Sequence, residues 1–67
     1  MAYLVKINGE VVDAAGKTLT EFLTEANYDL RTIVIERNEE IVSKLKYDET
    51  VIKDGDIIEI ISFMGGG

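Results

Sequence analysis

Near the end of the 67-residue chain stands the stretch Ile57-Ile58-Glu59-Ile60-Ile61-Ser62-Phe63. Its β-branched residues predict a strand, in which successive side chains point to opposite faces of a sheet. Because the Glu59 carboxylate is unsuited to a dry core, we expect it to mark the outer face. By alternation the outer face also carries Ile57, Ile61 and Phe63, and the inner face carries Ile58 and Ile60. The outer residues then form an exposed apolar patch that docks a partner, unless Ile61 or Phe63 tucks under a loop as ordinary core.

The start of the chain predicts a β-hairpin over about residues 2–13. Tyr3, Val5 and Ile7 recur with the period of a strand that has one buried face. The pair Asn8-Gly9 suits a type I′ turn, whose two central residues both need positive φ. Residues 10–13 are then the returning strand.

A short helix is expected to begin after Thr18. The Thr18 hydroxyl and the Glu21 carboxylate have the spacing of a capping box. Asn27 is a suitable stop because it tolerates the left-handed conformation. The apolar stripe at helical spacing consists of Leu19, Phe22, Leu23 and Ala26. A helix of about two turns is not stable alone, so this stripe is expected to cover a sheet.

The middle of the chain predicts two more strands. Residues 32–37 read as an internal strand, and Asn38 with Glu39 turns the chain into a short strand at 40–42. A tight turn at 53–56, with Gly55 at positive φ, precedes the final strand. The apolar anchors of the irregular stretch between them are expected to be Leu45, Tyr47 and Val51.

This order of elements predicts an α+β fold, with one mixed β-sheet of four to five strands and one main helix packed across one face. If the final strand pairs parallel to the first in the centre of the sheet, the fold is the ubiquitin-like β-grasp. We expect one domain over residues 1–64 and a flexible glycine tail at 65–67.

Composition excludes several classes of function. The chain has no cysteine and no histidine, and hence no thiol nucleophile, disulfide or imidazole base. A net charge of −6, with dispersed basic residues, argues against nucleic-acid binding. No signal peptide or membrane-span-length apolar run is apparent, so we expect a cytoplasmic protein without a membrane partner. Asp54 and Asp56 flank a turn glycine, and a solvated turn is a better interpretation than a cation site. We expect no metal site and no catalytic residue.

The sequence ends Phe63-Met64-Gly65-Gly66-Gly67. Glycines lack a Cβ atom and can enter a channel that side chains would block. Fully extended, three residues reach about 10 Å. We therefore expect the carboxylate of Gly67 to be the reactive group, carried by Gly65 and Gly66, and partners to bind Ile57, Ile61, Phe63 and Met64. On position alone, a frayed terminus is the alternative.

Four segments together resemble the sulfur-carrier family of thiamine (thiazole) biosynthesis, the ThiS type, over the full length of the chain. They are Asn8-Gly9-Glu10, residues 33–41, Asp54-Gly55-Asp56 and the ending from Phe63 to Gly67. The resemblance implies that an E1-like, ATP-using enzyme adenylates Gly67. Sulfur from a cysteine desulfurase system then displaces AMP, and the resulting thiocarboxylate donates sulfur to thiazole synthase. It also implies a carrier that is not itself an enzyme, binds no cofactor and uses ATP only through its partner.

Three other interpretations remain open. The small subunit of molybdopterin synthase, or another β-grasp sulfur carrier, shares the diglycine ending, but the short length and Phe63-Met64 favour the thiazole branch. A protein modifier would join its tail to lysine instead of sulfur. A non-carrier β-grasp interaction module, a different class, would not need Gly67 to be the last residue.

Overall fold

A computed structural model of the chain describes residues 4–63. Its strands are β1 (Val5–Ile7), β2 (Glu10–Val12), β3 (Ile33–Arg37), β4 (Glu40–Val42) and β5 (Ile57–Ser62). The α-helix is α1 (Leu19–Glu25), and two 3-10 helices are η1 (Leu30–Thr32) and η2 (Lys44–Lys46). The predictions about Met64 and the glycine tail at 65–67 lie outside the described residues.

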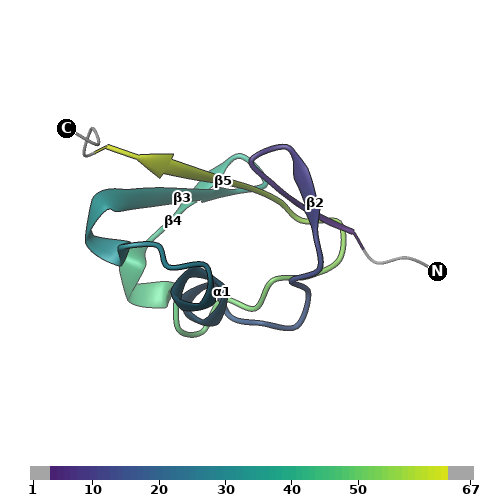
Figure 1. Ribbon diagram of the computed structural model, residues 1–67, viewed down its shortest axis with the longest axis horizontal. Helices are drawn as coiled ribbons and strands as arrows, with labels where there is room; N and C mark the ends of the chain where they lie inside the picture. The colour runs from purple at the N-terminus through teal and green to yellow at the C-terminus, as the bar shows by residue number, and fades with distance from the viewer. Residues whose placement is uncertain (1–3, 64–67) are drawn as a thin grey trace.

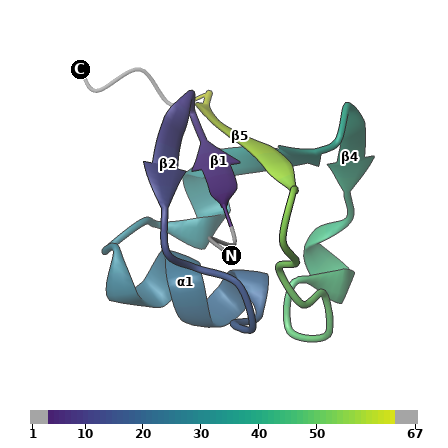
Figure 2. The same cartoon turned by 90° about the vertical axis from the view of Figure 1, so that its right-hand side faces the viewer.

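The strands form one mixed sheet in the order β2-β1-β5-β3-β4 (Figure 1; Figure 2). β5 lies in the centre, parallel to β1 and antiparallel to β3. Helix α1 lies on one side of this sheet, and the described segments leave the other side open (Figure 1). The α+β fold class, with five strands and a central final strand, is confirmed.

In each hairpin, the turn that connects the two strands has positive φ at its two central residues. These are Asn8 and Gly9 in the first hairpin, and Asn38 and Glu39 in the second. Each asparagine also accepts a hydrogen bond from β5: Ile60 N donates to Asn8 Oδ1 at 2.7 Å, and Ile57 N donates to Asn38 Oδ1 at 2.9 Å. Asparagine therefore serves twice here, because it tolerates the left-handed conformation and its amide binds the central strand.

The capping box at Thr18 is confirmed, since the Thr18 hydroxyl accepts from the Glu21 amide and the Glu21 carboxylate accepts from the Thr18 amide. The helix ends before Asn27, which has a φ of 64°. Leu19 and Leu23 are buried against the sheet, with Phe22 packed beside them. Ala26 was wrongly predicted to share this stripe: it is the exposed C-cap, because the helix ends at Glu25.

The irregular stretch before β5 covers the remaining part of the core. Tyr47 and Ile52 are buried, whereas Leu45 is 90% exposed and Val51 is also exposed, so the predictions for Leu45 and Val51 are wrong. The reason is the close backbone pairing with the start of the helix: Ile52 N donates to Lys17 O at 2.8 Å. This pairing directs Ile52 inward and its neighbour Val51 outward.

Candidate docking face

The two sides of β5 have the environments that its alternation predicts. Ile58 is 1% exposed and Ile60 packs against the core. Ile57, Ile61 and Phe63 are 54%, 44% and 55% exposed. The prediction of an outer apolar surface is confirmed for these three residues, and none of them is ordinary core.

The register of the sheet extends this surface across the neighbouring strands. Ile61 lies opposite Val34 of β3, and Ile57 lies beside Lys6 of β1. On the edge strand β4, the exposed Ile41 lies opposite Glu36. We call the uncovered side of the sheet the open face; it comprises Lys6, Val11, Val34, Glu36, Ile41, Ile57, Glu59 and Ile61. Sequence reasoning missed Ile41 and Val11, and the outward position of each follows only from strand pairing.

Phe63 lies just beyond β5, at the root of the glycine tail. Its amide donates to Thr32 O at 3.1 Å, which continues the β3–β5 pairing past the end of the strand. The Lys44 ammonium of η2 lies 5.6 Å from the centroid of the Phe63 ring, within the range of a cation–π contact. Phe63 is thus held just beyond the end of β5 and remains exposed.

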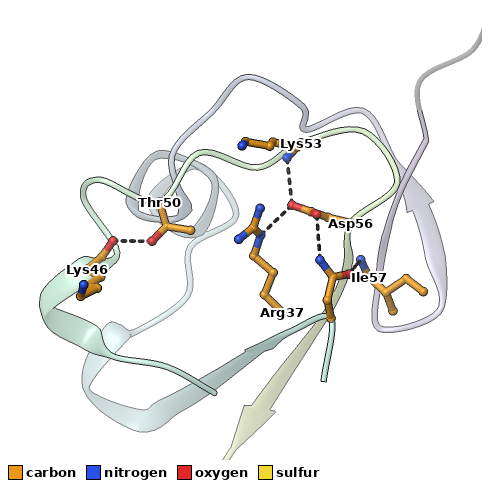
Figure 3. A network of polar contacts seen from close by, with 7 residues as sticks. Arg37, Lys46, Thr50, Lys53, Asp56 and Ile57 are labelled. Carbon is orange, nitrogen blue, oxygen red and sulfur yellow. Dashed lines mark hydrogen bonds and ion pairs between the residues drawn. The ribbon is translucent and has the colours of Figure 1, made fainter. Parts of the chain in front are cut away.

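A hydrogen-bond network fixes the residue that precedes β5 (Figure 3). Asp56 is buried and accepts hydrogen bonds from Arg37 Nε at 2.7 Å, Asn38 Nδ2 at 3.0 Å and Lys53 N at 2.9 Å. Burial alone raises the pKa of Asp56, but these hydrogen bonds and the Arg37 charge outweigh it and hold the pKa below its usual value. The network therefore stabilises the ionised carboxylate and orients the start of the central strand.

This burial corrects part of the sequence interpretation of the 53–56 turn. Asp54 is exposed, as expected of a solvated turn, but Asp56 is not solvated. Gly55 has a φ of 85°, as predicted. Within residues 4–63, no group of acidic side chains has the arrangement of a metal site.

The described residues hold no cavity in which a small substrate would be enclosed. No helix among residues 4–63 is long and apolar enough to cross a membrane. What the described part of the chain offers is a surface: the open face, with the exposed Phe63 just beyond the end of β5.

A mixed sheet with its final strand in the centre, one helix across one side and an open face on the other defines a ubiquitin-like β-grasp protein. The sequence pattern of the ThiS family matches residues 1–67. The chain therefore belongs to the ThiS family.

Named relatives agree with this assignment. The sulfur carrier protein ThiS of Thermus thermophilus is 36% identical over 64 residues, which cover 96% of this chain and all of that protein. A crystal structure of the thiamine biosynthesis protein ThiS from Geobacter metallireducens superposes with a TM-score of 0.80 at 31% identity, covering 96% of this chain and 99% of that one.

Two longer relatives are named as thiazole synthases. The protein of Paramagnetospirillum magneticum is 44% identical over 62 residues, which are 91% of this chain but only 19% of that protein. In the protein of Magnetococcus marinus, the matched region covers 94% of this chain and 20% of the relative. The chain thus spans about a fifth of these relatives and the whole of the Thermus carrier.

Proposed function

We propose that the chain is a sulfur carrier of thiamine biosynthesis, and that the carboxylate of Gly67 carries the sulfur. The observation that supports this most is the match to the ThiS family over residues 1–67, which includes the glycine ending. The composition agrees, because a chain without cysteine or histidine depends on partners for its nucleophile and base.

The proposed reaction takes place in three steps. A carboxylate is a poor electrophile, so an E1-like enzyme first transfers AMP from ATP to Gly67, and pyrophosphate leaves. A persulfide loaded by a cysteine desulfurase system then attacks the acyl carbon, and AMP departs with one of the carboxylate oxygens. In the third step a thiol of the sulfur-donor system reduces the resulting acyl disulfide, which releases the thiocarboxylate and leaves the thiol in a disulfide. Gly65 and Gly66 provide the slim chain that carries the acyl carbon into the active site of each partner.

Thiazole synthase is the proposed acceptor of the sulfur. Two relatives named thiazole synthase each contain a region similar to this chain within a longer polypeptide. When a carrier-like region and a thiazole synthase are joined in one polypeptide, this supports an interaction between the corresponding proteins where they are separate chains. Because the steps draw on ATP and cysteine-derived sulfur, we place them in the cytoplasm.

The open face is the proposed docking site for these partners. Ile57, Ile61 and Phe63 are exposed apolar residues next to the tail, and we include Met64 because it follows them directly. Contacts on this face would supply affinity, while the glycines deliver the reacting group.

Intact mass spectrometry tests the proposal. The chain is incubated with the E1-like enzyme, ATP, the desulfurase, cysteine and a thiol reductant, and we expect the mass gain of one oxygen replaced by sulfur. A variant that lacks Gly67 serves as control and should show no gain. An unchanged mass of the full chain would contradict the carrier function, whereas a product joined to a lysine would identify a protein modifier instead.

A further inference from the structure

Two carboxylates lie directly opposite each other in the middle of the open face. Glu36 of β3 and Glu59 of β5 are cross-strand partners in an antiparallel pair. Like charges in this position destabilise a sheet. Neither carboxylate forms an ion pair or a side-chain hydrogen bond with any residue of the described range 4–63.

The nearby cations do not neutralise this pair. Arg37 points to the other side of the sheet, where its guanidinium binds Asp56. Lys6 lies on the open face beside Ile57, but it forms no ion pair with Glu36 or Glu59. The pair is therefore a repulsive contact for which the described part of the chain supplies no counter-charge.

Exposed apolar side chains surround the two carboxylates. Ile57 and Ile61 flank Glu59 along β5, and Ile41 lies on the far side of Glu36. Charged residues are depleted in the centres of protein interfaces unless they are paired across them. An apolar surface with a doubly negative centre is thus complementary to an apolar partner surface with a positive centre.

We propose that Glu36 and Glu59 together bind an arginine side chain of thiazole synthase, and that apolar residues around this arginine pack on Ile41, Ile57 and Ile61. The inference rests on the proposed function. Arginine suits the site better than lysine, because its planar guanidinium has five N–H donors and serves two carboxylates at once. Binding also removes the repulsion between the carboxylates.

A second copy of the chain is a poor occupant of the same face. In a two-fold dimer centred on this face, both copies would place Glu36 and Glu59 at the interface, which brings four carboxylates together. Each copy also has a net charge of −6. The carboxylate pair therefore opposes self-association while it favours a basic partner.

The test compares two variants with the same change of charge. In E36Q/E59Q the central pair is neutral; in the control E10Q/E49Q, two exposed carboxylates outside the open face are neutral. We measure the Kd of the full chain for the thiazole synthase of the same organism by calorimetry. E36Q/E59Q should bind about tenfold to a hundredfold more weakly than wild type, since it leaves a buried guanidinium unpaired. The control should lose about threefold or less, because only long-range attraction changes.

The melting temperature provides a second readout, which should not fall when the affinity for the synthase falls. E36Q/E59Q should melt at the same temperature as the wild type or higher, because the cross-strand repulsion is gone. The single variant E59Q changes only an exposed side chain, so it serves as the test if the double variant does not fold.

Four results would overturn the inference. If E36Q/E59Q and E59Q bind the synthase with the wild-type Kd, no cation of the synthase binds between these carboxylates. An equal loss in the control would mean that only net charge matters. A loss of binding to the E1-like enzyme, with synthase binding intact, would assign the pair to another partner. Wild-type protein that becomes a thiocarboxylate but does not bind the synthase would remove the proposed partner and this inference, and leave the carrier chemistry in place.

Discussion

The inner and outer faces of β5 carry the same side chain in opposite environments. Ile58 is almost completely buried, and its neighbour Ile57 is more than half exposed. Burial of an isoleucine contributes about 1.5–3 kcal/mol relative to exposure, so the inner face carries most of the stability of this strand. The outer residues contribute little to folding, which leaves their identity free to be set by a partner.

Charged residues show the same contrast. Asp56, immediately before β5, is buried and receives three hydrogen bonds from Arg37, Asn38 and Lys53. Glu59, three positions later, is exposed and has no ion pair within the described residues. The same short segment of chain thus holds one carboxylate that stabilises the fold, just before β5, and a second one within β5 that is available to bind.

The sharpest test of the two faces is Ile58→Ala against Ile57→Ala. The inner substitution should lower the free energy of unfolding by about 2–5 kcal/mol, because it removes buried methyl groups and leaves a cavity. That is a large share of the stability of a domain this small. The outer substitution should change it by about 0.5 kcal/mol or less. Urea denaturation measures both values, and similar losses would contradict the assignment of faces.

Asp56→Asn should show a smaller but pH-dependent loss. Removing the charge weakens hydrogen bonds that are worth roughly 1.5–3 kcal/mol when one partner is ionised. The pKa of Asp56 is lowered in the folded state, so its stabilisation is complete above the unfolded pKa of about 3.9 and is lost as the pH falls through the folded value. Acid denaturation of wild type and variant should therefore converge at low pH. If the free energies of unfolding of wild type and variant differed by the same amount at every pH, the charge of Asp56 would not be what stabilises the fold.

Phe63→Ala should separate docking from folding. Phe63 is 55% exposed, so the melting temperature should change little, whereas the affinity for partners should fall about tenfold, or by 1–2 kcal/mol. Calorimetric titration with the E1-like enzyme and with thiazole synthase gives the affinities. Deletion of Gly67 is the matched control, because it should keep binding and abolish thiocarboxylate formation. Unfolding of Phe63→Ala would place this residue with the inner face.

The smallest effect is expected for Tyr47→Phe. The Tyr47 hydroxyl is buried, and no group in residues 4–63 lies in hydrogen-bond geometry with it. Burial raises the pKa of Tyr47, and the nearby backbone of Ile35 lowers it only in part. Loss of the hydroxyl should leave stability unchanged or raise it by up to about 1 kcal/mol. A clear loss in thermal unfolding would reveal a partner for this hydroxyl.

Local patterns predicted much of this fold. Alternation placed Ile57 and Ile58 on their faces, Asn8-Gly9 marked the turn, and Thr18 with Glu21 marked the start of the helix. Each of these signals lies within a few residues of sequence. The tail that carries the proposed chemistry lies outside the described residues, so Gly67 stays a prediction.

The remaining features depend on residues that are distant in sequence. Val51 and Ile52 are equally apolar, and only the pairing of Ile52 with Lys17 determines which of them is buried. Likewise, Glu36 and Glu59 become neighbours only through the β3–β5 register. No local signal predicts such pairs, because register is set by the assembled sheet.

The position of β5 has a consequence for biosynthesis. The central strand is translated after both hairpins, and its pairing joins residues as distant as Asn8 and Ile60. Until β5 emerges from the ribosome, β1 and β3 have no strand between them, and the core residues Ile7 and Ile35 lack their β5 partners Ile58 and Ile60. The core of this domain therefore cannot close before β5 has been made, after both hairpins that it joins.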